Sequence, residues 1–97
     1  MKDVVAELRV GVKDLAAEDR GGWVPLALSD RVRDLVGLTE IMQVELIRGL
    51  AQWDRVTAWA EDGAVTAVSW LKANTILAGG EATGLVRLAR LYDQHDA

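Results

Sequence analysis

A chain of 97 residues, 51% hydrophobic and 27% charged, fits one small folded domain and excludes wholesale disorder. The absence of Cys and the presence of a single His exclude disulfides, thiolate metal sites and mechanisms that need two histidines. The net charge of −4 is unfavourable for wrapping a polyanion. Lys2, Asp3 and Glu7 interrupt the apolar start of the chain, and no uncharged run approaches the roughly 18 residues of a membrane span. We therefore expect a cytoplasmic protein without a signal peptide or a membrane-spanning segment.

The first twenty residues carry apolar side chains at helical spacing. Val4, Leu8, Val12 and Leu15 recur every three or four positions, which predicts an N-terminal helix within residues 1–20. Gly21-Gly22 and Pro25 then mark a connection. Strict alternation of apolar and polar residues is absent throughout, so we expect no strands and an all-α fold of four helices.

The second helix is predicted to be long and central, over residues 30–60. Ser29 is a suitable N-cap, and Asp30 would lie where the helix dipole favours a negative charge. No proline interrupts this stretch. At about 1.5 Å per residue the helix would extend roughly 45 Å, more than the roughly 30 Å diameter of a small domain. Part of it should therefore remain uncovered by the shorter helices.

The apolar residues of this helix occupy more than one side. One broad stripe contains Val32, Leu35, Met42, Leu46, Leu50, Trp53 and Val56, whereas Ile41, Val44 and Trp59 fall on a different side. A helix with apolar residues on two sides needs two packing partners. We predict an interface with a second copy or another protein that contains Ile41, Val44, Ile47 and Trp59. An isologous homodimer with antiparallel central helices is the simplest geometry.

The last third of the sequence predicts a hairpin of two short helices over residues 64–92. Thr66 can cap a helix that ends near Ala73, and the final helix ends near Tyr92. We expect residues 93–97 to fray. Together with the preceding helices this hairpin would complete a single helical domain over residues 1–97.

The order and spacing of several short motifs resemble the N-terminal region of the 13E12-repeat family, also known as domain of unknown function 222. The motifs are Trp53-Asp54-Arg55, Trp59-Ala60-Glu61-Asp62-Gly63-Ala64, Trp70-Leu71, Gly80-Glu81-Ala82 and Leu85-Val86-Arg87-Leu88-Ala89-Arg90. The resemblance covers residues 30 to 92, and the family also places a leucine-rich helix before the first motif. Full-length members of the family typically end in an HNH endonuclease domain.

The chain departs from the family pattern in two respects. The turn Thr75-Ile76-Leu77-Ala78 replaces a Thr-Gly-Leu-Ser type of sequence, so Ala78 cannot form the capping box that Ser would form with Glu81. The family's domain also continues with further helices, and one His cannot supply an HNH constellation. The resemblance therefore implies a shortened relative that lacks the HNH domain, and it carries no metal-dependent cleavage to this chain.

The hairpin over residues 66–90 has the outline of a helix-turn-helix, which suggests a DNA-targeting module as an alternative function. Its phosphate contacts would be Lys72, Arg87 and Arg90. The charge of residues 64–97 sums to zero, whereas a duplex reader normally presents a basic stripe. DNA contact is thus only weakly supported by the sequence.

The sequence contains no arrangement that predicts catalysis or cofactor binding. Gly79-Gly80 lacks the Lys-Ser/Thr of a phosphate-binding loop, and the adjacent carboxylates Glu61 and Asp62 point away from each other on a helix. We therefore expect no enzyme activity, no cofactor, no metal and no small-molecule substrate. The favoured hypothesis is a non-catalytic association module, either a homodimer or a partner of another protein.

Overall fold

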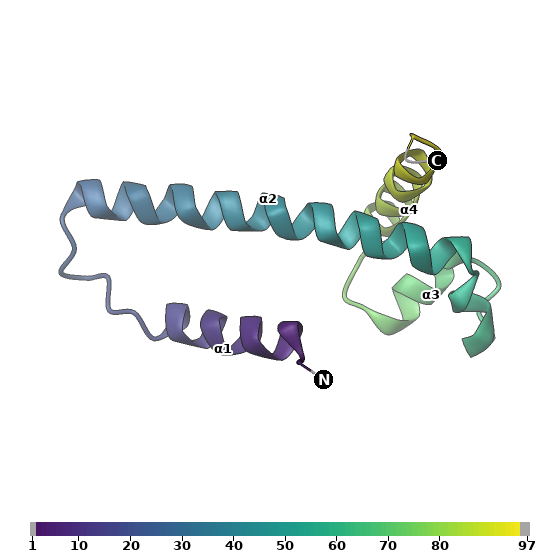
Figure 1. Cartoon of the computed structure of the whole chain (residues 1–97), viewed down its shortest axis with the longest axis horizontal. Helices are drawn as coiled ribbons and strands as arrows, with labels where there is room; N and C mark the ends of the chain where they lie inside the picture. Colours follow the sequence, from purple (N-terminus) through teal and green to yellow (C-terminus); the bar gives the residue numbers. More distant parts are fainter. Residues whose placement is uncertain (1, 96–97) are drawn as a thin grey trace. The chain divides into compact units, whose positions relative to one another are not determined.

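The computed structural model describes residues 2–95, which fold into four α-helices and one short 3-10 helix (Figure 1). The predicted all-α class is therefore confirmed. The chain separates into two compact units, one up to Leu35 and one from Val36 onward. The single-domain expectation remains a prediction. Of the predicted tail 93–97, residues 93–95 continue the last helix, and residues 96 and 97 lie outside the described part.

The N-terminal unit begins with helix α1, Val4–Ala16. Asp3 caps it: its carboxylate accepts a hydrogen bond from the Ala6 backbone N–H at 3.1 Å, which satisfies one of the donors left free in the first turn. The helix ends four residues before the predicted limit of 20, and none of its residues is buried. The apolar stripe predicted for this segment is present, but it does not form a core.

An arginine-centred cluster holds the connection between α1 and the start of the next helix. Glu18 accepts hydrogen bonds from Arg20 at 3.1 Å and from Arg31 at 2.7 Å. The Arg31 guanidinium also lies 5.3 Å from the ring centroid of Trp23, a cation–π contact. Burial raises the pKa of Glu18, but the hydrogen bonds from Arg20 and Arg31 outweigh it and leave the pKa below its usual value.

Helix α2 spans Pro25–Arg55, so the predicted long helix is confirmed, but it begins and ends five residues before the predicted limits of about 30 and about 60. Pro25 is the first helical residue, a position where its missing N–H costs nothing and its fixed φ favours the helix. The Leu28 N–H already donates to the Val24 carbonyl at 3.2 Å. Ser29 and Asp30 therefore lie inside the helix, and Ser29 is not its N-cap.

The C-terminal end of α2 is set by a reversal of the backbone. Thr57 has φ of 50°, in the left-handed region, which a regular helix cannot continue through. The chain then forms the 3-10 helix η1, Ala58–Asp62, which ends at Gly63 with φ of 84°. Glycine tolerates this conformation because it has no Cβ. Trp59 is consequently on η1 and not on α2.

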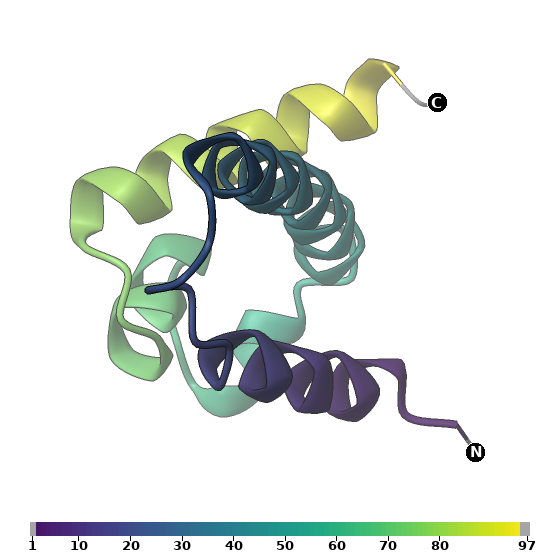
Figure 2. The same cartoon turned by 90° about the vertical axis from the view of Figure 1, so that its left-hand side faces the viewer.

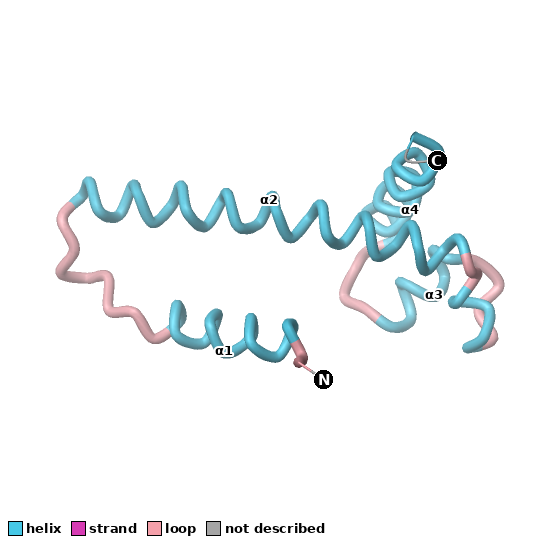
Figure 3. The backbone as a smooth tube through the Cα atoms, viewed as in Figure 1, coloured by secondary structure: helices cyan, strands magenta, loops and turns pink. Residues whose placement is uncertain are grey.

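The predicted hairpin is present as α3, Ala67–Asn74, and α4, Gly79–His95, joined by a short turn (Figure 2). Thr66 caps α3 as predicted: its hydroxyl accepts from the Ser69 N–H at 3.0 Å, and the Ser69 hydroxyl accepts from the Thr66 N–H at 3.2 Å. Helix α4 runs three residues past the predicted end at Tyr92. Figure 3 shows helices and loops throughout residues 2–95, and no strand.

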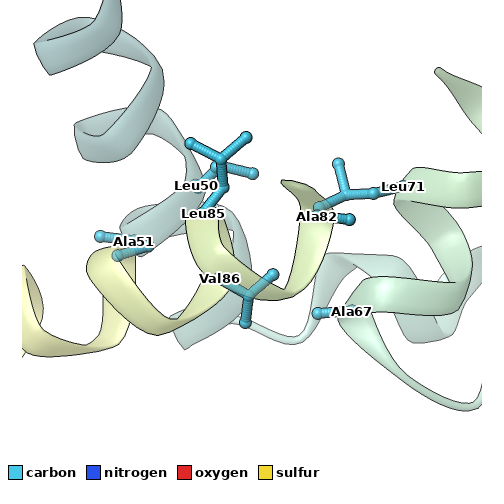
Figure 4. Close-up of a cluster of buried hydrophobic side chains, with 8 residues drawn as sticks. Leu50, Ala51, Ala67, Leu71, Ala82, Leu85 and Val86 are labelled. Atoms are coloured by element: carbon cyan, nitrogen blue, oxygen red, sulfur yellow. The ribbon is translucent and has the colours of Figure 1, made fainter. Parts of the chain in front are cut away.

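The core of the second unit lies where α3 and α4 pack on the last turns of α2 (Figure 4). Its buried members are Leu50, Ala51, Ala67, Leu71, Ala82, Leu85, Val86 and Ala89. Half of them are alanines, and the small side chains of Ala67, Ala82 and Ala89 let α3 and α4 approach closely. Trp53 and Trp70 meet edge to face beside this core, with ring centroids 5.1 Å apart. This core covers α2 only in its C-terminal part.

Candidate interaction surface

The central part of α2 is uncovered along much of its length. Its large aliphatic residues between 26 and 46 are 38–71% exposed, apart from the half-buried Leu35; they are Leu26, Leu28, Val32, Val36, Leu38, Ile41, Met42, Val44 and Leu46. Exposed aliphatic side chains scattered singly are ordinary, but nine on one helix leave apolar area uncovered on more than one side of it. Contact with another apolar surface would remove this area from water.

The four residues of the predicted interface fall into two groups. Ile41 and Val44 are 62% and 54% exposed, and they remain available for a partner. Ile47 and Trp59 are half-buried and pack against the core of the second unit. The structure therefore does not bring the four residues together on one free surface, because the hairpin covers the side of α2 that carries Ile47.

Trp59 is further held by a polar contact at the end of α2. Its indole N–H donates to the Asp54 carboxylate at 3.1 Å, and Arg90 donates to the same carboxylate at 2.9 and 3.2 Å. These contacts connect α2, η1 and α4. The hydrogen bond from Arg90 holds the pKa of Asp54 below its ordinary value, and it raises the pKa of Arg90. Arg55 and Asp93 form a second ion pair between α2 and α4.

The three residues predicted to contact DNA do not lie together in the structure. Arg87 and Arg90 border one cavity of about 280 Å³. Arg87 is exposed and has no hydrogen-bond or ion-pair partner among residues 2–95, but the guanidinium of Arg90 is already neutralised by Asp54. Lys72 is not part of this cavity, and its aliphatic chain lies against Gly79. The three cations therefore do not form one basic surface.

An apolar groove of about 400 Å³ lies beside Leu46, which is at the end of the uncovered stretch. It is lined by Glu45, Leu46, Gly49, Leu50, Trp53, Trp70, Leu71 and Thr75. We refer to it as the tryptophan groove. The sequence placed Trp53 on the apolar stripe of the long helix and did not predict a groove beside it. The glycine at position 49, one turn before Trp53, was the signal that could have indicated an opening.

No three His, Cys, Asp or Glu side chains within residues 2–95 lie close enough together to hold a metal ion. Of the helices in the described part, none is both long and apolar enough to cross a membrane.

Comparisons with known proteins identify no relative of this chain. No protein-family model, no curated protein and no solved structure matches it.

Proposed function

We propose that the chain is a non-catalytic association module that binds a second copy of itself through the uncovered part of α2. The observation that carries this proposal is the row of exposed aliphatic residues between Leu26 and Leu46. Burial of apolar surface stabilises a contact by about 25 cal/mol per Å² before the costs of association are subtracted. A second copy is the simplest partner because an isologous contact needs only one self-complementary surface.

A DNA-targeting module remains the alternative function, in line with the resemblance to the 13E12-repeat region. The exposed Arg87 and the hairpin of α3 and α4 support it. The ion pair between Arg90 and Asp54 weighs against it, because phosphate contact by Arg90 would have to break that pair.

Salt dependence separates the two functions. In one experiment, a small amount of protein labelled at its N-terminus is titrated with unlabelled protein. In a parallel experiment, a labelled DNA duplex is titrated with the unlabelled protein. Both are carried out at about 50 and at about 300 mM salt. We expect self-association whose dissociation constant changes less than about threefold, because apolar burial releases few counterions. Absence of self-association together with steeply salt-dependent duplex binding would support the alternative and contradict the proposal.

A further inference from the structure

One aliphatic side chain in the turn between α3 and α4 is fully exposed to water. Ile76 is 103% exposed, the largest value for a large hydrophobic residue within residues 2–95. The next residue, Leu77, packs against the core of the second unit. The turn thus buries one of its two aliphatic side chains and leaves the other projecting. Contact of Ile76 with another apolar surface would remove it from water.

The tryptophan groove lies beside the same turn. Thr75, the residue before Ile76, lines the groove together with residues of α2 and α3. Ile76 is fully exposed, so its side chain does not fill the groove of its own chain. Both features belong to the second unit, which begins at Val36. One surface of this unit therefore presents a projecting aliphatic side chain next to an apolar groove.

The groove and the turn are both nearly free of charge. Glu45 is the one charged residue that lines the groove, and its carboxylate is already paired with Arg48 at 2.6 Å. The eight residues 73–80 around Ile76 contain no charge, although 27% of the chain is charged. A charged group in the groove would lose hydration without gaining a partner. The groove therefore favours an uncharged apolar occupant, and the turn is one.

Two polar groups at the groove are already satisfied within the chain. The indole N–H of Trp70 donates to the Asp62 carboxylate at 2.7 Å. The hydroxyl of Thr75 donates to the Leu71 carbonyl at 2.6 Å. An aliphatic side chain can therefore cover Trp70 and Thr75 without depriving either group of its hydrogen bond.

We propose that Ile76 of a second copy inserts into the tryptophan groove, and that the two copies exchange this contact about a two-fold axis. This inference rests on the proposed self-association and identifies one contact within it. A two-fold axis brings the same surface of both copies together. A surface on which a projecting side chain adjoins a groove is complementary to itself, so the contact forms twice and closes as a dimer.

The size and position of the groove fit this occupant. Its volume of about 400 Å³ lies within the roughly 300–1,000 Å³ of pockets that enclose small ligands, so it has room for an isoleucine side chain. The groove also continues the uncovered side of α2, because Leu46 lines it and is 41% exposed. Met42 lies about one turn before Leu46 on the same side. A copy seated in the groove therefore also approaches Met42.

Disulfide formation between single-cysteine variants tests the contact, because the natural chain has no Cys. Ile76→Cys and Gly49→Cys chains are prepared separately, mixed and oxidised, so that a mixed disulfide joins two copies. No atom lies within 4 Å of a Cβ built on Gly49, which leaves space for the new side chain. Val65→Cys mixed with Gly49→Cys is the control, since Val65 is 83% exposed and does not line the groove. We expect the first mixture to give at least about ten times more mixed disulfide.

Removal of the isoleucine side chain provides a second measurement. We expect Ile76→Ser to raise the dissociation constant of self-association at least about tenfold, because both contacts of the dimer are lost. Val65→Ser, at the other strongly exposed position, should change it less than about twofold. Neither side chain belongs to the core, so both variants should keep the helix content and the melting temperature of the natural chain.

The outcomes distinguish this inference from the proposed function. A mixed disulfide no more abundant than in the control, or an unchanged dissociation constant for Ile76→Ser, would overturn the inference. Self-association of the natural chain would then remain, mediated by another surface. A monomeric mass for the natural chain would contradict the proposed function itself, and this inference with it.

Discussion

Replacing Met42 by Glu is expected to weaken self-association by at least about 100-fold, equivalent to about 3 kcal/mol. Met42 is 53% exposed in the chain, and we expect it to be buried on the side of α2 that binds the second copy. Symmetry introduces the carboxylate twice, and each would have to be desolvated without a partner of opposite charge. Sedimentation equilibrium of the natural and variant chains measures the change.

Val44→Glu provides a matched control for this variant. Val44 is 54% exposed, and it lies two residues after Met42, which places it about 160° away around the helix. We expect its dissociation constant to change less than about twofold. Both variants should keep the helix content of the natural chain, as measured by circular dichroism. Dissociation by Val44→Glu and not by Met42→Glu would assign the interface to the side that carries Ile41 and Val44.

Asp54→Asn is expected to lower the free energy of unfolding of the second unit by about 1 to 2 kcal/mol at pH 7. The carboxylate side chain is 16% exposed and accepts hydrogen bonds from Arg90 and Trp59. Asn keeps the size of Asp and one acceptor oxygen, but it loses the charge that pairs with Arg90. Because Arg90 is largely exposed, water screens its charge. We therefore expect a loss in the free energy of unfolding below the largest values for hydrogen bonds to charged groups.

The pH dependence of this difference follows from the lowered pKa of Asp54. Since folding lowers the pKa, the unfolded chain takes up the proton first as the pH falls, and the stabilisation is lost. The difference between natural and variant chains should be constant from pH 7 down to the ordinary Asp value of 3.8, and then shrink as the pH falls through the folded-state pKa. Urea unfolding at several pH values measures it. Glu61→Gln, at an exposed position, is the control, and a difference that persisted undiminished at pH 2 would contradict this account.

Local signals in the sequence predicted those parts of the fold that local hydrogen bonds determine. The cap at Thr66 was predicted because a hydroxyl group just before a helix can accept a hydrogen bond from a free backbone N–H of the first turn, here that of Ser69. The start of α2 was misplaced because Ser29 and Pro25 are competing start signals. Proline prevailed, since its fixed φ suits the first helical position. The reversal at Thr57 has no comparable signal, because residues other than Gly and Asn rarely adopt a positive φ.

The candidate interaction surface was predicted only in part, because helical spacing is a local signal that does not report packing between distant residues. Helical spacing showed that α2 has more apolar sides than its short neighbours can cover. It did not show which side the hairpin occupies, because that depends on contacts between residues far apart in sequence, such as Asp54 and Arg90. The hairpin therefore removed Ile47 and Trp59 from the predicted interface and left Ile41 and Val44 exposed.

The central claim is that the uncovered part of α2 is covered by a second copy of the chain. The most direct test is the absolute mass of the natural protein in solution, measured by light scattering over a range of concentrations. We expect a mass that rises with concentration from one chain of 10.6 kDa to a plateau at two chains. A mass that stays at one chain up to about 1 mM, the limit of weak affinity, would contradict it.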